Sequence, residues 1–303
     1  MTEQELKTYL AAIRGADEAT MAAARRRQAA LAKPPGSLGK LEDMAVRMAG
    51  VTGRVCPTVK KCRVAVFAAD NGVVAEGVSC APQSVTLQQA VNMTRRKTGM
   101  SALAQTFGDD VSVIDVGINA DVNCDAVLDR KVRRGTGNMA VEPAMTRAEA
   151  LQALAAGMEA AARAKADGID LLGVGEMGIG NTTTSSAVLA ALTGLSVERV
   201  TGRGGGMTDE GFALKKRVIA SALVLHKPNG GDVLDTLCKV GGLDIAAMCG
   251  VFLGAARCRL PAVIDGLISA VAALCAVRLC PAARDYLFAS HLSREIGYQA
   301  AIK

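Results

Sequence analysis

Short apolar runs that alternate with long alanine-rich stretches constrain the fold of this 303-residue chain more than any other feature. Apolar runs bounded by Gly, Asp and Asn are typical of parallel strands buried on both faces, with crossover helices covering the sheet. The sequence therefore predicts an α/β fold with a parallel sheet and helices on both faces. The predicted strands are Val64–Ala68, Val111–Val116, Ile169–Val174, Ala262–Ile264 and Tyr286–Ala289.

The helices are expected in the stretches between these runs and at the start of the chain. Residues 147–166 and 210–225 have helical length and composition, and the apolar segment 266–277 is too short to span a bilayer and is interpreted as a buried helix. Residues 1–31 predict an alanine-rich helix and 38–51 a second one. Lys33-Pro34-Pro35-Gly36 separates the two, because Pro fixes φ and lacks an N–H.

Composition narrows the function classes. The net charge is only +6 and the basic residues are spread out, while aromatic residues make up 3% of the chain, which argues against nucleic-acid binding and fits an anionic small molecule. The nine cysteines form no C-x-x-C pair and there are only two His, so we expect reduced thiols and no metal site. The N-terminus lacks the features of a signal peptide, and we expect a cytoplasmic protein without a membrane segment.

The polar, glycine-rich segments follow the predicted strands, where ligands collect in parallel sheets. The richest is Gly173–Ser185, which follows a strand and opens a helix. Its glycines let backbone N–H groups approach an anion, and the helix start adds free donors and a favourable dipole. We expect this loop to bind a phosphate. The alternative interpretation is a tight turn that binds nothing.

Two familiar motifs overlap in this loop, and neither is complete. Gly173-x-Gly175-x-x-Gly178 matches a dinucleotide fingerprint, with Glu198 about twenty residues further on. Gly175 and Gly180 have the spacing of a triphosphate loop, but Asn181 stands where that motif requires Lys. The sequence therefore predicts a single phosphate rather than a triphosphate as the guest.

A second glycine-rich segment, residues 201–210, also precedes a predicted helix. Arg203 could pair with a phosphate or carboxylate. The alternative is a helix start capped by Thr208 with an acidic first turn, and the two interpretations are compatible.

Four acids, Asp70, Glu176, Asp265 and Glu295, lie at or just beyond predicted strand ends. Because burying an acid is costly unless it is paired, their common position favours a functional cluster over four separate caps or salt bridges. Ser290, His291 and Ser293 lie close together, but no G-x-S-x-G elbow supports a hydrolase.

At these motifs the sequence resembles the nicotinate-nucleotide–dimethylbenzimidazole phosphoribosyltransferases, in family order and over nearly the whole chain. The matching segments are KPPGSLGKLE (33–42), FAADNGVVAEGVS (67–79), GTGNMAVEPAMT (135–146), GEMGIGNTTTSSA (175–187), TGRGGGMTDEG (201–211), GGLDIAAMCG (241–250), DGLISAVAAL (265–274) and YLFASHLSREIGY (286–298).

The resemblance implies a Rossmann-like large domain at 51–290 and a small helical domain built from residues 1–50 and the C-terminal tail 291–303. It also implies a homodimer, no cofactor and no metal. The implied catalytic residues are Glu295 as the base and Glu176. The implied phosphate- and ribose-binding residues are Gly175, Gly178, Gly180, Asn181, Thr182, Thr183 and Arg203, the base pocket takes Ser79, Asp70 and Gln88, and Asp265 and Ser290 are further candidates.

The implied reaction moves the phosphoribosyl group of nicotinate mononucleotide onto 5,6-dimethylbenzimidazole or a related base in cobamide assembly. The chain departs from the family pattern at Asn71, where His is usual, at Gly205, where Thr is usual, and at Tyr298, where the family segment ends in His. These departures bear on the choice of base.

Three other functions remain open from the sequence. The chain could use adenine, another benzimidazole or a phenol as the acceptor. It could be a non-catalytic nucleotide-binding homologue, although it retains Glu176 and Glu295. It could be an NAD-dependent dehydrogenase on the strength of the dinucleotide fingerprint, although catalytic His residues are scarce.

Overall fold

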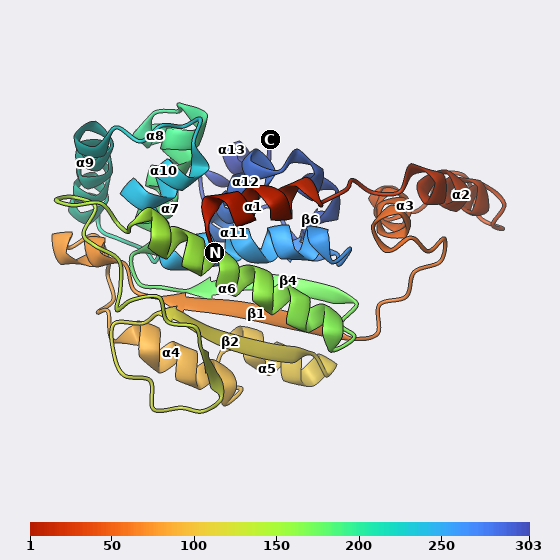
Figure 1. Ribbon diagram of the computed structural model, residues 1–303, viewed down its shortest axis with the longest axis horizontal. Coiled ribbons are helices and arrows are strands. Elements are labelled where there is room, and N and C mark those ends of the chain that lie inside the picture. The colour runs from red at the N-terminus through yellow and green to blue at the C-terminus, as the bar shows by residue number, and fades with distance from the viewer.

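The computed structural model describes residues 1–303 and is built around one six-stranded, wholly parallel sheet (Figure 1). The strand order is β3-β2-β1-β4-β5-β6, which is the doubly wound order of nucleotide-binding folds. This confirms the predicted α/β class. The strands are β1 (Cys62–Ala69), β2 (Asp110–Gly117), β3 (Val127–Asp129), β4 (Leu171–Met177), β5 (Ala262–Ile264) and β6 (Leu287–Ala289).

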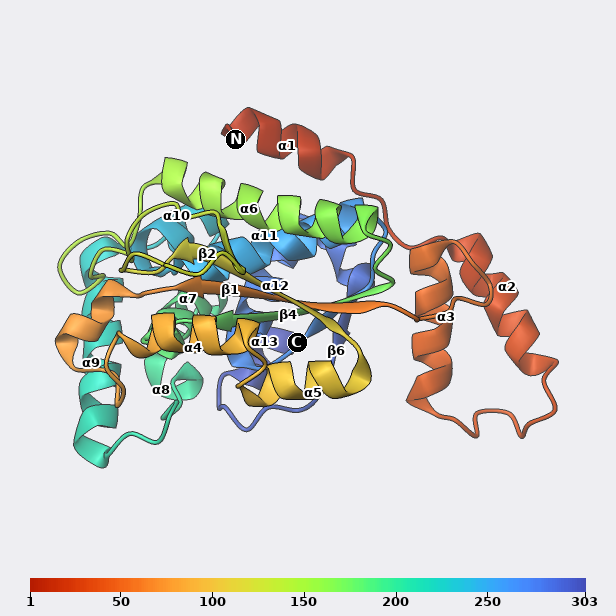
Figure 2. The same cartoon turned by 90° about the horizontal axis from the view of Figure 1, so that it is seen from below.

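Helices cover both faces of the sheet. Figure 2 shows α6 and α11 on one side of the strands and α4 and α5 on the other. No helix of the structure is both long enough and apolar enough to cross a membrane. The helices are α1 (Glu3–Ala11), α2 (Glu18–Ala29), α3 (Lys40–Thr52), α4 (Val85–Thr94), α5 (Gly99–Phe107), α6 (Arg147–Ala166), α7 (Asn181–Thr193), α8 (Val197–Val200), α9 (Asp209–His226), α10 (Val233–Val240), α11 (Leu243–Arg257), α12 (Leu267–Leu279) and α13 (Tyr298–Ile302), with short 3₁₀ turns η1 (Gly72–Glu76) and η2 (Pro281–Tyr286).

The structure corrects two details of the sequence prediction. The single helix expected over residues 1–31 is two helices, because the Asp17 side chain accepts a hydrogen bond from Thr20 N (2.6 Å) and starts α2 afresh. The prediction also missed β3, which has only three residues and pairs with β2 alone. So short an edge strand leaves no recognisable apolar run in the sequence.

The core is built from small side chains, and two helix backbones touch within it. Every residue of α11 from Leu243 to Ala256 is buried. A Cβ placed on Gly157 of α6 would lie 1.9 Å from Ala247 O, and one on Gly250 of α11 would lie 2.0 Å from Leu154 O. Glycine is therefore required at both points of the α6–α11 contact, which explains how a chain with few aromatics fills its interior.

We expect Gly157→Ala to destabilise the protein by about 1–3 kcal/mol or more, because the added methyl group meets backbone and pushes α6 away from α11. Urea unfolding monitored by circular dichroism measures this loss. Gly99→Ala in α5 is the matched control, since a Cβ there meets nothing within 4 Å. Equal stability of the two variants would contradict the proposed close packing.

The two ends of the chain occupy different places. The α2–α3 pair packs on itself and projects at the opposite end from the arrowheads of β1 and β4 (Figures 1 and 2). Arg47 of α3 anchors it, because its guanidinium stacks 4.3 Å from the Phe288 ring and donates to Asp285 O (3.2 Å). The C-terminal α13 packs instead against α12 and α7. How the chain divides into domains stays a prediction.

Candidate functional site

The strand order reverses between β1 and β4, and this is the position at which doubly wound sheets bind ligands. Phe67 of β1 pairs with Glu176 of β4, so the polar residues that follow the two strands emerge side by side. Asp70 and Asn71 follow β1, and Gly178 follows β4. Both Asp70 and Asn71 are buried.

The first glycine-rich loop passes through a tight space at this edge. A Cβ on Gly178 would lie 2.4 Å from Ala69 O, and Gly180 has a φ of 93°. Only glycine suits either position. The loop ends in α7, where Asn181 N donates to Gly178 O (3.1 Å) and Thr183 N to Gly180 O (3.0 Å), so that Thr182 N is the donor of the first turn that has no partner. Thr182 keeps part of its surface exposed, whereas Thr183 is fully buried inside α7.

A buried lysine joins this loop to the second glycine-rich segment. The Lys215 ammonium on α9 donates to Thr182 Oγ1 (2.8 Å) and to Gly202 O (3.2 Å). Its side chain is 1% exposed, and this burial lowers its pKa to about 8, although the Glu295 carboxylate nearby favours the charged form. An ammonium has three N–H donors, so one remains for a bound anion.

The sequence analysis did not identify Lys215. Its position in the helical repeat indicates its burial, because Lys215 lies on the same face of α9 as the buried Val218, Ile219 and Ala222. A charged side chain on the buried face of a helix needs a partner, and that need is a sign of function.

Arg203 is held by its own segment in this structure. Its guanidinium donates to Met207 O (3.0 Å), pairs with Asp209 and lies over the Phe212 ring. Thr208 caps α9 by accepting from Gly211 N (3.2 Å), as the alternative interpretation of this segment predicted.

The Glu295 carboxylate lies against the second glycine-rich segment. A Cβ on Gly202 would lie 1.7 Å from Glu295 Oε2, so only glycine leaves room for this side chain. The same carboxylate lies close enough to Lys215 to favour the charged form of that lysine. Asp265 follows β5 and is exposed, with His291 Nδ1 at 4.0 Å, and Ser290 Oγ lies 2.8 Å from that same nitrogen. Because serine and acid share one ring nitrogen, the three do not form a hydrolase triad.

A second acid, also absent from the sequence prediction, accompanies Glu176. Asn181 Nδ2 donates to Glu176 Oε2 and to Asp244 Oδ2 (3.0 Å). Burial raises the pKa of Glu176 to about 8, and the neighbouring Asp244 contributes to the rise. Burial also raises the pKa of Asp244, to about 6. The segment GGLDIAAMCG carried Asp244 in the sequence, but nothing in its spacing distinguished this acid from a helix cap.

The expected base-pocket residues lie on the β1 side of the edge. Asp70 Oδ2 accepts from Asn119 N (2.8 Å), and burial raises the pKa of this carboxyl group. The Ser79 hydroxyl donates to Ala81 O (3.0 Å) in the loop before α4. Gln88 is exposed on α4, and Thr86 of the same helix accepts from Ile179 N (3.1 Å), which ties α4 to the first glycine-rich loop.

The three departures from the family pattern have distinct surroundings. Asn71 is buried under the loop, where its Oδ1 accepts from Thr184 Oγ1 (3.2 Å). Gly205 faces the exposed Cys80, whose Sγ lies 3.5 Å from Gly205 O. Tyr298 is buried and its hydroxyl has no partner.

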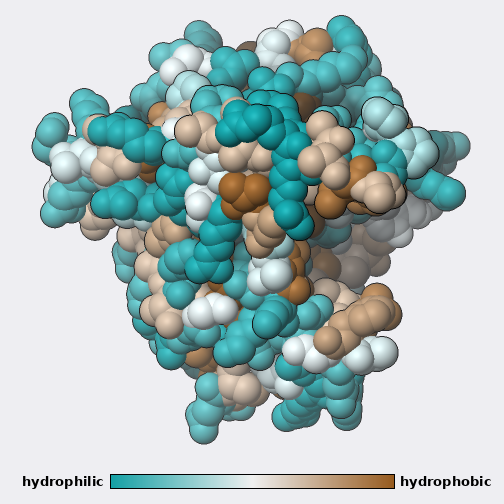
Figure 3. All heavy atoms as spheres, turned by 90° about the vertical axis from the view of Figure 1, so that its right-hand side faces the viewer, coloured by the Kyte–Doolittle hydropathy of each residue, from teal (hydrophilic) through white to brown (hydrophobic).

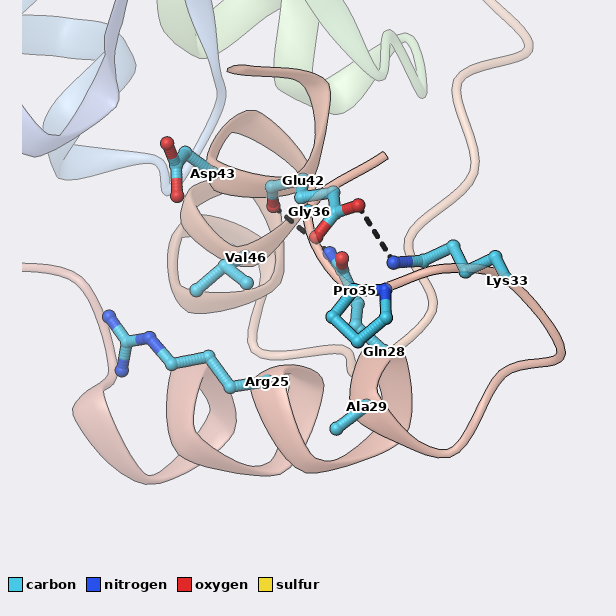
Figure 4. A pocket seen from close by; sticks show the side chains of 9 residues that line it. All are labelled: Arg25, Gln28, Ala29, Lys33, Pro35, Gly36, Glu42, Asp43 and Val46. Atoms are coloured by element: carbon cyan, nitrogen blue, oxygen red, sulfur yellow. Dashed lines mark hydrogen bonds and ion pairs between the residues drawn. The ribbon is translucent and has the colours of Figure 1, made fainter. Parts of the chain in front are cut away.

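Two hollows lie at the α2–α3 pair, away from the strand ends. One of about 250 Å³ is lined by Arg25, Lys33 and Glu42, with Lys33 Nζ 2.7 Å from Glu42 Oε1 (Figure 4). Another of about 370 Å³ lies beside the exposed Leu38 and Leu41. Figure 3 views the molecule from this side and shows apolar surface interrupting hydrophilic surface.

Comparisons with known proteins agree with this architecture. A family model described as phosphoribosyltransferase matches residues 13–303. Among named relatives, nicotinate-nucleotide–dimethylbenzimidazole phosphoribosyltransferase of Clostridium perfringens is 50% identical over 298 residues, covering 98% of this chain and 82% of the relative. The protein of the same name from Geobacter sp. strain M21 is 48% identical over 299 residues, covering 98% and 86%. The crystal structure of the enzyme of that name from Thermus thermophilus superimposes with a TM-score of 0.89 at 44% identity, covering 94% of this chain and 85% of that one.

Proposed function

Because the chain belongs to the nicotinate-nucleotide–dimethylbenzimidazole phosphoribosyltransferase family, we propose that its strand-end site moves the phosphoribosyl group of nicotinate mononucleotide onto 5,6-dimethylbenzimidazole or a related base. The products are α-ribazole 5′-phosphate and nicotinate. The observation that carries the proposal is the meeting of the two glycine-rich segments at Lys215, with Glu295 beside them.

The donor phosphate binds at the start of α7. The first turn of α7 offers the N–H and the hydroxyl of Thr182, and Lys215 offers its third N–H and a positive charge. A phosphate there is neutralised by the ammonium of the buried Lys215. Arg203 would reach it only after leaving Asp209, so we assign Arg203 to the rim of the site.

Glu295 acts as the general base. The bond between the anomeric carbon and the pyridinium nitrogen breaks, and nicotinate leaves with the bonding electrons. One nitrogen of the acceptor base attacks the opposite face of the ribose while its other nitrogen loses a proton to Glu295. Attack from that face turns a β-linked donor into an α-linked product.

Glu176 stabilises the positive charge that develops on the ribose, which requires its anionic form. Asp70, Ser79 and Gln88 form the acceptor side: Asp70 follows β1, Ser79 lies in the loop before α4, and Gln88 lies on α4, which Thr86 ties to the first glycine-rich loop. Asp265 and Ser290 lie at the exposed mouth beyond β5 and β6.

We expect mass spectrometry to show a phosphoribosylated benzimidazole when the protein is mixed with nicotinate mononucleotide and 5,6-dimethylbenzimidazole. Adenine, other benzimidazoles and phenols belong in the same panel, because Asn71, Gly205 and Tyr298 depart from the family pattern. NAD is the control donor. Tight binding of NAD together with an inert nicotinate mononucleotide would contradict the proposal and favour a dehydrogenase.

The protein works as a cytoplasmic homodimer in this proposal. Support comes from the exposed apolar side chains of the α2–α3 pair, among them Leu38, Leu41 and Met44. Monomeric proteins seldom leave such side chains gathered at the surface. Sedimentation velocity, which measures the mass of the particle in solution, tests the dimer.

A further inference from the structure

One amide nitrogen connects two carboxylates at the centre of the site. Asn181 Nδ2 carries two hydrogens and donates to Glu176 Oε2 and to Asp244 Oδ2 (3.0 Å). Asn181 begins α7, Glu176 lies near the end of β4 and Asp244 lies in the first turn of α11. The bridge therefore joins α11 to the β4–α7 unit, which is more than sixty residues away in sequence.

No positive charge balances this pair. Neither carboxylate lies within salt-bridge distance of a Lys, Arg or His side chain. The charged groups at the neighbouring strand ends are also acidic. Asp265, which follows β5, raises the pKa of Glu176, and Asp70, which follows β1, raises the pKa of Asp244. Asp244 is fully buried, whereas Glu176 keeps part of its surface exposed.

Two ionised carboxylates in such surroundings repel each other without water or a cation to screen them, so the pair retains a proton that an isolated acid would lose. Asn181 donates to both and cannot neutralise either. We propose that Asp244 is a positioning residue of the transfer reaction: its negative charge, held beside Glu176 by the Asn181 amide, determines when Glu176 becomes an anion. Burial raises the pKa of both groups, and the Asp244 charge adds to the rise for Glu176, in agreement with this arrangement.

The consequence for catalysis rests on the proposed function. Glu176 is protonated while no positive charge lies next to its carboxyl group, and a donor with a pyridinium ring favours its anion. Binding of the donor therefore expels a proton from Glu176 to solvent through its exposed side, and Glu176 is then charged before the ribose becomes cationic. Asp244 touches no substrate in this scheme and acts only through Glu176.

The first test follows the ionisation of Glu176 itself, in protein without substrate. ¹³C NMR of carboxyl-labelled Glu, with Glu176→Gln to identify the resonance, gives its titration midpoint. We expect a midpoint near pH 8 in the wild type and a fall of about one pH unit or more in Asp244→Asn, because a neighbouring anion is removed. Asp265→Asn is the matched control, and its effect should be smaller because Asp265 is exposed to water.

A wild-type midpoint at the ordinary value for Glu would overturn the proposal even if Asp244→Asn failed to fold. An unchanged midpoint in a folded Asp244→Asn variant would overturn it as well. Thermal unfolding of the variant confirms that it is folded. Chelator in all samples ensures that a bound metal ion does not replace the proton.

The second test counts the protons released when the donor binds. Calorimetry at pH 7 in buffers of different ionisation enthalpy should show about 0.4 more proton released by the wild type than by Asp244→Asn, because a midpoint that falls from about 8 to about 7 leaves Glu176 only half protonated in the variant. Lys215 and the donor phosphate also titrate near this pH, but their contributions cancel between the two proteins. Equal release from both would contradict the proposal. If the protein binds no nicotinate mononucleotide but Glu176 titrates as expected in both proteins, the proposed function is contradicted. The effect of Asp244 on the ionisation of Glu176 is then still supported.

Discussion

Replacing Glu295 with Gln is expected to lower turnover by about 100- to 10,000-fold, the usual contribution of a general base. Gln keeps the shape of the side chain against Gly202 but cannot accept the proton of the acceptor base. Donor affinity should stay nearly unchanged, because the phosphate contacts lie on α7 and Lys215. Single-turnover kinetics with saturating substrates measures the chemical step directly.

Two comparisons separate this role from a structural one. The loss should be smaller for an acceptor base that gives up its proton more easily. Glu210→Gln is the matched control, since this acid lies at the exposed start of α9 and should leave the rate unchanged. A near wild-type rate in Glu295→Gln, or a large fall in melting temperature with the rate preserved, would remove Glu295 from the mechanism.

Replacing Lys215 with Met is expected to weaken donor binding by about 10- to 100-fold, because a hydrogen bond to a charged group contributes about 1.5–3 kcal/mol. Met fills the buried space without the charge. The neighbouring Lys216, which lies 4.4 Å from the Phe212 ring on the partly exposed side of α9, provides the control variant Lys216→Met. Calorimetric titration with nicotinate mononucleotide compares the two.

The pH dependence of phosphate binding provides an independent measurement of Lys215. Its lowered pKa of about 8 means that the ammonium is charged below pH 8 and neutral above it. Affinity for ribose 5-phosphate, which has no pyridinium to engage Glu176, should therefore fall as the pH rises through 8. The fall should be absent in Lys215→Met. A similar fall in both proteins would place the titrating group elsewhere.

The sequence was sufficient for five of the six strands and for the loops at the sheet edge, because burial on both faces leaves apolar runs and Gly or Asp ends or follows β1, β2, β4 and β5. Glu176 and Asp70 could be placed at strand ends for that reason. The partners of Lys215 and Asp244 could not be predicted: the apolar face of α9 indicates only that Lys215 is buried, and neither helix sequence shows what its inner face contacts. Their partners Thr182 and Asn181 are distant in sequence, and only the packing of α9 and α11 brings them together.

The strand order also determines which strands can pair first while the chain is being synthesised on the ribosome. β1 pairs with β2, which follows soon after it, but its other edge waits for β4: Phe67 and Glu176 are partners more than a hundred residues apart. At a synthesis rate of about 5–20 residues per second, this edge stays open for roughly 5–20 s. An apolar central strand with an unpaired edge is prone to join other chains. The nascent chain is therefore most vulnerable to aggregation before its catalytic half has emerged.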